Sequence, residues 1–226
     1  MDKHLIMVYD LETSGLPLFR EPSTHPGQPH IVQVAAGLYT PEGDPVELYD
    51  TIVRPDRWTI PQEVADIHGI TTERALAEGI PEADMLQKVD AMWSRARLRV
   101  AHNEQFDARI MRIAYCRFRT KALADQWKDG PAECTQRMAT PILALPPTEK
   151  MRRAGRHHHK SANLSECIRH FFDRDHGDAH TATADRDGCA DVYFHIKAGR
   201  HLLAEPVAAA PPAQVDMFPP DDEPVL

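Results

Sequence analysis

Short apolar runs alternate with turn residues in the first quarter of the chain, and this pattern predicts three β-strands. The runs cover 5–12, 30–40 and 46–54; they are rich in β-branched and aromatic residues and too short for helices. The turn sequence PEGD joins the last two runs, whereas the proline-rich segment 17–30 separates the first two and predicts a surface loop. Sequential strands with short connections favour an antiparallel meander.

After Pro61 the apolar residues recur with a helical period. Met85, Val89, Met92 and Trp93, for example, fall on one face of a helix. We predict helices over 61–70, 71–79, 81–96, 103–127, 162–172 and 181–203, with a short buried strand over 98–102. This order of elements predicts an α/β fold, one domain over 1–204 with a mixed central sheet flanked by helices.

Composition places the chain among globular proteins. Its 226 residues are 42% hydrophobic and 27% charged. No apolar run approaches the ~20 residues of a membrane span, and we expect neither a signal peptide nor a membrane partner. The four cysteines are scattered without CxxC pairs, which favours reduced thiols in the cytoplasm over disulfides or zinc.

Charge is distributed unevenly along the chain. Residues 205–226 carry five acids and no Lys or Arg, so removing them changes the formal net charge from −8 to −3. Segment 95–121 has eight Lys or Arg against two acids, and segment 150–160 has five Lys or Arg and three His. Such patches fit a polyanion partner or a solvated surface equally well. We interpret 150–160 as a solvated basic loop near nucleic-acid phosphates.

Two carboxylates at the end of the first strand raise a chemical question. Asp10 and Glu12 are two positions apart, so on a strand they point to the same face. Partly buried side by side they repel each other unless a cation neutralises them. Hard divalent ions such as Mg²⁺ or Mn²⁺ prefer these oxygens. Taken alone, the pair is better explained by two solvated acids at a strand end.

Further acids and one histidine favour the metal site. Asp107 opens the helix that follows the strand 98–102, and Asp185 lies in the last helix, five residues after His180. Together with Asp10 and Glu12, these acids can form a centre for two Mg²⁺ or Mn²⁺ ions, which stabilise the attacking and leaving oxygens of a phosphodiester displacement. A histidine titrates near neutral pH and can accept the proton of an attacking water.

Three motifs in order resemble those of the DEDDh family of 3′→5′ exonucleases. They are YDLETSGL, AHNEQFD and HTATADRDGCADVY, and the segments EVADIHGIT and KSANLSECIRHFF fit the family between them. This is the family of the proofreading epsilon subunit of bacterial DNA polymerase III. The resemblance covers roughly 5–200 and implies an RNase H-like exonuclease fold with 3′→5′ exonuclease activity.

The resemblance also implies roles for individual residues. The metal ligands would be Asp10, Glu12, Asp107 and Asp185, and the general base would be His180. Contacts to the terminal nucleotide would come from Thr13, Glu63 and His68, which rest on the resemblance alone. A sister group carries Tyr where this chain has Thr181, which fits the histidine branch. His176 lies close by, but the spacing favours His180 as the base.

The tail from 205 to 226 predicts a flexible segment with a docking peptide. From Pro206 onward it holds six prolines among acids and alanines. The apolar interruption QVDMF, 214–218, resembles the peptide by which bacterial proteins bind the polymerase sliding clamp. Gln214, Met217 and Phe218 would make the contacts. A chance apolar cluster, or a tail that packs on its own domain, remains an alternative.

The sequence therefore predicts a metal-dependent exonuclease that releases nucleoside monophosphates from single-stranded or frayed DNA 3′ ends, in proofreading, replication or repair. An RNA-directed enzyme, RNase T-like or oligoribonuclease-like, fits the same metal ligands, because no reader of the 2′-hydroxyl is evident. A non-catalytic module that binds polymerase or clamp is the alternative from another class. The short stretch after QVDMF favours a free-standing or a phage- or plasmid-type nuclease.

Overall fold

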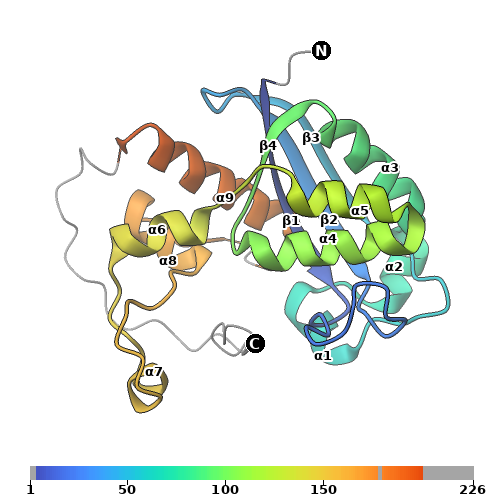
Figure 1. The fold of residues 1–226 in the computed structure, drawn as a ribbon, viewed down its shortest axis with the longest axis horizontal. Coiled ribbons are helices and arrows are strands. Elements are labelled where there is room, and N and C mark those ends of the chain that lie inside the picture. Colours follow the sequence, from blue (N-terminus) through green and yellow to red (C-terminus); the bar gives the residue numbers. More distant parts are fainter. Residues whose placement is uncertain (1–3, 178–179, 201–226) are drawn as a thin grey trace.

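One mixed sheet forms the centre of the computed structural model, which describes residues 4–177 and 180–200 (Figure 1). The strands are β1 (Leu5–Thr13), β2 (Ile31–Tyr39), β3 (Pro45–Ile52), β4 (Ala96–Ala101) and β5 (Ala132–Cys134). They lie in the order β3-β2-β1-β4-β5. β1, β2 and β3 pair antiparallel, as the predicted meander requires, whereas β4 and β5 extend the sheet in parallel.

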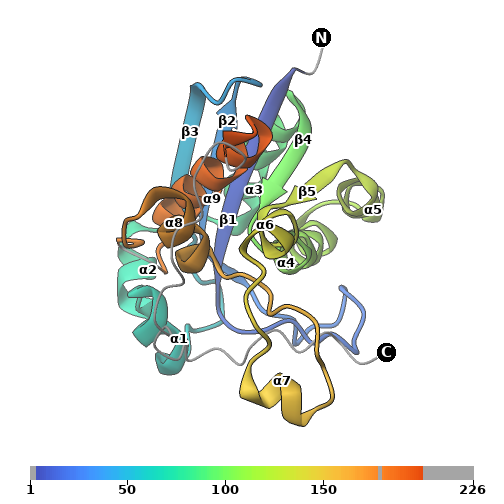
Figure 2. The same cartoon turned by 90° about the vertical axis from the view of Figure 1, so that its left-hand side faces the viewer.

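Helices cover both faces of this sheet. They are α1 (Gln62–His68), α2 (Thr72–Glu78), α3 (Glu82–Trp93), α4 (Glu104–Phe118), α5 (Lys121–Asp129), α6 (Thr135–Leu143), α7 (Glu149–Arg153), α8 (Leu164–Phe172) and α9 (Ala182–Lys197). α3 and α4 pack on one face and α9 on the other, where α6 and α8 support it (Figures 1 and 2). The prediction of a mixed sheet flanked by helices is confirmed.

The main core lies between the sheet and α3–α5. Every residue of β2 is buried, because helices cover both sides of this strand. On α3, the predicted stripe is buried at Met85, Val89 and Met92, and Trp93 packs against the same cluster. A smaller cluster under α9, around Val8 and Tyr193, fills the opposite face. The central strand β1 is thereby held from both sides.

The predicted helix 103–127 is in fact two helices. At Arg119 the backbone leaves the helical region, with φ −130° and ψ −142°, and the side chain of Thr120 then caps α5 by accepting from the backbone N–H of Leu123. A threonine hydroxyl competes with helical hydrogen bonds and favours an N-cap. Sequence analysis also missed β5, α6 and α7, which are short or, in α6, interrupted by Pro141.

The segment 17–30 is a loop, as predicted, but its interior is tightly bonded. Backbone and side chain of Ser14 pair with the backbone of His30 at 2.9 Å, which closes the loop at its base. Inside it, the amide of Gln28 accepts from Leu18 N–H and donates to the carbonyls of Leu18, Glu21 and Pro22. Gln28 is only 2% exposed, so it is the polar centre of the loop.

Arginines of α4 fix the same loop from outside. Arg109 donates to the carbonyl of Glu21 at 2.6 Å, and Arg117 donates to the carbonyl of Gln28 at 2.9 Å. Arg112 bonds Asp125 of α5, and Arg119 bonds Asp90 of α3. The basic charge of the run 95–121, which the sequence leaves open between a polyanion surface and a solvated one, is thus partly taken up inside the protein. Neighbouring carbonyls and carboxylates bond the guanidinium groups of Arg109, Arg112 and Arg119.

Two sequence predictions concern membranes and the tail. Within 4–177 and 180–200, no helix combines the length and apolarity needed to cross a bilayer. The predicted tail, including the clamp peptide at Gln214, Met217 and Phe218, lies outside the described residues.

We expect Gln28→Ala to lower the free energy of unfolding by about 1–3 kcal/mol, since the substitution leaves buried backbone groups of the loop without partners. Urea denaturation measures this change. The matched control is Gln62→Ala, because Gln62 is exposed and bonds only Asp66 among the described side chains. Equal stabilities of the two variants would show that the Gln28 amide does not hold the loop.

Candidate metal and catalytic site

The end of β1 places two carboxylates on one face of the sheet. Asp10 and Glu12 are half-buried, while Leu11 between them is buried on the opposite face. Asp10 lies opposite Ala35 and Glu12 opposite Gln33 in the antiparallel pairing with β2. The alternation along a strand thus fixes both carboxylates on the side that α9 covers.

α9 brings a third carboxylate to this face, and its first turn is anchored to the sheet. The backbone N–H of Ala182 donates to the Gln33 side chain at 3.3 Å. Gln33 in turn donates to Asp50 of β3 at 3.0 Å, and the Thr183 hydroxyl donates to the same carboxylate. These bonds set the start of the helix, and Asp185 follows in its first turn.

The carboxylates of Asp10, Glu12 and Asp185 converge. Each offers an oxygen that lies within 4.8 Å of the others. The donor set contains only carboxylate oxygens, which suit a hard divalent cation such as Mg²⁺ or Mn²⁺ rather than zinc. The structure therefore brings together three of the four acids that the sequence proposes as metal ligands.

Asp107, the fourth acid, approaches from the other side of β1. It lies in the first turn of α4, is 3% exposed, and accepts a hydrogen bond from the backbone of Leu11. It is outside the three-residue cluster but close enough to raise the pKa of Asp10. Glu104, in the same first turn of α4, forms an ion pair with the buried Arg99 at 2.8 Å.

The acids strongly perturb one another. Burial raises the pKa of Asp10 well above its usual value, and the charges of Asp107, Asp185 and Glu12 raise it further. Burial, followed by the charge of Asp185, raises the pKa of Glu12 to about 8. Burial raises the pKa of Asp185 as well, but His176 and His180 oppose this rise. Without a cation, part of the cluster is protonated near neutral pH, and a bound cation would displace these protons.

Two histidines lie beside Asp185, in different ways. Nε2 of His176 is 3.2 Å from Oδ1 of Asp185, and the His176 side chain is only 4% exposed. His180 is exposed in the turn before α9, with φ +69°, and its backbone hydrogen-bonds the Asp185 carboxyl. His180 therefore lies in the entering turn, as the sequence predicts, and is open to solvent. Sequence spacing gave no sign that His176 would contact the carboxylate.

His102 is another histidine near this site that sequence analysis left without a role. Nδ1 bonds the Thr135 hydroxyl at 2.9 Å and Nε2 bonds the carbonyl of Ala162 at 3.0 Å. Burial lowers its pKa to about 4, so the ring is neutral and ties the end of β4 to α6 and α8. The position of His102 in the AHNEQFD motif was the one sign in the sequence that it has a role. Its hydrogen bonds make that role structural.

The three residues that rest on the resemblance alone are spread over two elements. Thr13 ends β1, is 7% exposed and bonds the carbonyl of Gly15 at 2.9 Å. His68 ends α1 and is 5% exposed; burial lowers its pKa, and the nearby backbone of Thr13 opposes this shift. Thr13 and His68 therefore meet, whereas Glu63 is exposed in the first turn of α1.

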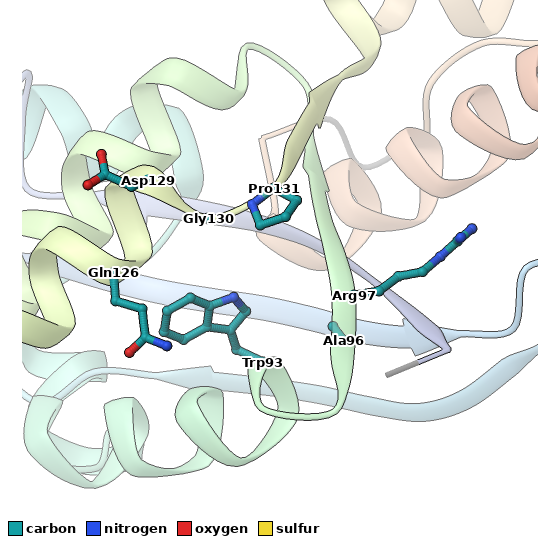
Figure 3. Close-up of a pocket in the computed structure, with 7 residues that line it drawn as sticks. All are labelled: Trp93, Ala96, Arg97, Gln126, Asp129, Gly130 and Pro131. Carbon is teal, nitrogen blue, oxygen red and sulfur yellow. The ribbon is translucent and has the colours of Figure 1, made fainter. Parts of the chain in front are cut away.

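A cavity of about 350 Å³ lies at the far end of the sheet from these residues (Figure 3). It is lined by residues from the end of α3, the start of β4 and the end of α5. Ala96 in its wall pairs with Leu5, the first residue of β1. Glu12 lies seven residues further along the strand, about 20 Å away at ~3.3 Å per residue. The cavity is therefore not part of the carboxylate site.

The comparisons with known proteins agree with this geometry. Residues 7–193 match the family described as Exonuclease (RNase T), so the chain belongs to the exonuclease family. The predicted RNase H-like exonuclease fold is confirmed. Among curated proteins, none matches the sequence.

Solved structures of exonuclease I share the fold. Escherichia coli exonuclease I in complex with a dA16 oligonucleotide is 20% identical, with a TM-score of 0.66 over 87% of this chain and 42% of that one. The complex of the same protein with a dT13 oligonucleotide is 19% identical, with a TM-score of 0.68 over 88% of this chain and 42% of that one. Exonuclease I from Methylocaldum szegediense is 22% identical, with a TM-score of 0.64 over 86% of this chain and 40% of that one. The chain spans less than half the length of these proteins.

We expect Glu12→Gln to stabilise the metal-free protein, and more so as pH rises from 5 to 8. Folded Glu12 keeps its proton up to a pKa of about 8, whereas the unfolded chain loses it near 4.5. Since the folded state binds more protons between these values, rising pH lowers the stability of the wild-type chain, and glutamine removes this contribution.

Thermal unfolding in a chelator at several pH values measures the effect. Asp56→Asn is the control, because the Asp56 side chain is 91% exposed. Parallel pH curves for Glu12→Gln and wild type would contradict the raised pKa of Glu12.

We expect His176→Ala to weaken Mn²⁺ binding about tenfold, because the imidazole holds the Asp185 carboxylate and such supporting contacts orient metal ligands. Calorimetric titration of Mn²⁺ without substrate measures this change. His158→Ala, at an exposed position in 150–160, is the control. Unchanged Mn²⁺ affinity in His176→Ala would show that the contact is incidental.

Proposed function

We propose that the protein is a metal-dependent 3′→5′ exonuclease that hydrolyses single-stranded or frayed DNA 3′ ends and releases nucleoside monophosphates. The observation that carries the proposal is the convergence of Asp10, Glu12 and Asp185 within 4.8 Å in a chain of the exonuclease family. Oligonucleotides bound to exonuclease I, a protein of the same fold, support single-stranded DNA as substrate.

In this proposal Asp10, Glu12 and Asp185 hold the divalent ions, and Asp107 completes the second site from α4. Two Mg²⁺ or Mn²⁺ ions, when bound, supply Lewis acidity at the phosphodiester. His180 accepts the proton of the attacking water, because its exposed imidazole lies in the turn that enters α9, beside Asp185. The buried His176 holds Asp185 in place.

The terminal nucleotide is the second part of the proposed site. Thr13, Glu63 and His68 would contact it, and their positions support this to different degrees. Thr13 directly follows Glu12 on β1, and the buried His68 lies against its backbone. Glu63 is five residues earlier on α1 and faces solvent, where an incoming strand can reach it.

The biological setting follows from the same proposal. Replication or repair in the cytoplasm would supply the frayed 3′ ends, and the scattered cysteines suit a reducing compartment. The peptide 214–218 would tether the nuclease to a sliding clamp and raise its concentration at the DNA.

We expect Asp10→Ala and Asp185→Ala each to abolish cleavage, because each substitution removes a ligand of the proposed metal ions. Both variants should keep the far-UV circular dichroism spectrum of the folded protein. The assay follows mononucleotide release from matched DNA and RNA strands, single- and double-stranded, with and without Mg²⁺. Wild-type turnover by either variant would refute the metal assignment. Faster degradation of RNA would reassign the substrate to an RNase T-like or oligoribonuclease-like enzyme.

His180→Ala tests the proton acceptor separately. We expect a loss of at least about 100-fold near pH 7 and partial recovery at higher pH, since hydroxide then replaces the base. A pH–rate profile with the wild-type shape would exclude this role for His180.

A further inference from the structure

Three large apolar side chains are exposed where the chain leaves β1. Leu16, Leu18 and Phe19 are 53%, 41% and 51% exposed. Leu16 belongs to the D-x-E-T-x-G-L motif, whereas Leu18 and Phe19 lie beyond the motif, in the loop that separates β1 from β2. Exposed apolar side chains that are neighbours along the chain form a candidate contact surface, whereas a single one would not.

The backbone beneath these side chains is fixed, so their exposure is not a matter of a loose loop. Gln28 bonds both the N–H and the carbonyl of Leu18, at 3.0 and 3.1 Å. Arg109 and Arg117 bond carbonyls further along the loop. Since Leu18 is held on both backbone groups, the loop presents Leu18 and Phe19 in a defined position.

The position of this loop relative to the carboxylates is also set. Ser14, two residues after Glu12, closes the loop against His30, so the loop begins where the metal-binding strand ends. α7 extends beyond the same end of the sheet as the loop (Figure 2). The segment 150–160 that includes most of α7 carries five Lys or Arg and three His. Apolar and basic surfaces therefore lie at the same end as the site.

We propose that Leu18 and Phe19 form a stacking platform for bases of single-stranded nucleic acid upstream of the nucleotide held at the carboxylates. This inference rests on the proposed function and names a binding surface for its substrate. Sequence-independent single-strand sites combine aromatic or apolar stacking surfaces with nearby positive charge, because every base has an apolar face and every linkage a negative charge. The exposed Arg20, next to Phe19, adds such a charge.

A nucleic-acid occupant fits better than a second protein. The platform is small, two side chains beyond the family motif, whereas stable protein interfaces bury about 800 Å² on each partner. It continues directly from the strand that carries Asp10 and Glu12, so a strand whose 3′ end enters the site passes near it. The basic charge of 150–160 complements phosphates.

The test uses Phe19→Ala, Leu18→Ala and the conservative Phe19→Trp in the full chain. Fluorescence anisotropy in a chelator, where no cleavage occurs, measures the affinity for dT12 and for the dinucleotide dT2. We expect both alanine variants to bind dT12 about tenfold more weakly, with dT2 unaffected, and Phe19→Trp to keep wild-type affinity. Leu76→Ala on α2, which removes an equally exposed leucine (53%), is the control.

Several outcomes would overturn the platform. Wild-type affinity for dT12 in Phe19→Ala, or an equal loss for dT2 and dT12, would do so. A wild-type dimer in light scattering that dissociates in Phe19→Ala would assign the surface to a second copy. If the wild-type chain binds dT12 through Phe19 but releases no mononucleotides with Mg²⁺, the proposed function fails and the platform stands.

Discussion

Electrostatic repulsion among the carboxylates at the end of β1 is the constraint on which the site depends. Asp10, Glu12 and Asp185 lie within 4.8 Å, and Asp107 raises the pKa of Asp10 from the other side. In a partly buried site such charges oppose folding unless protons or cations neutralise them. The fold must therefore hold in place groups that repel one another, and it does so with contacts that lie outside the cluster itself.

Those contacts hold the acids in three different ways. β1 is central and buried between two helical layers, so its backbone cannot move away. The start of α9 is bonded to β2 and β3 through Gln33 and Asp50. Asp107 is fixed by the backbone of Leu11. The bonds that position β1 and α9 do not involve the carboxylates of Asp10, Glu12 or Asp185, so a change of charge on these acids leaves the bonds in place. This suits a site that exchanges protons for metal ions.

The sequence was sufficient for the parts of this arrangement that depend on local spacing. Asp10 and Glu12 share a face because they alternate on a strand, and the meander and the helices follow from apolar periodicity. The sequence was not sufficient where a side chain bonds a residue that is distant in the chain. The basic run 95–121 fitted a polyanion partner or a solvated surface equally well, yet Arg109 and Arg117 bond carbonyls of the loop 17–30, some 90 positions earlier. Likewise, spacing could favour His180 but could not reveal that His176 contacts Asp185.

The arginines also change where a negatively charged substrate would be attracted. With guanidinium groups of α4 bonded to the loop, to Asp125 and to Asp90, the run 95–121 offers less to phosphates than its charge suggests. The basic segment 150–160 lies at the same end of the sheet as the acids, with Arg153 paired to Glu149 and Lys160 paired to Glu166. What the arginines supply instead is rigidity: they fix the loop that begins two residues after Glu12. A fixed apolar surface loses little entropy when bases stack on it. The hydrogen bonds from the arginines of α4 to the loop would therefore favour binding at the apolar surface of that loop, although α4 does not form this surface.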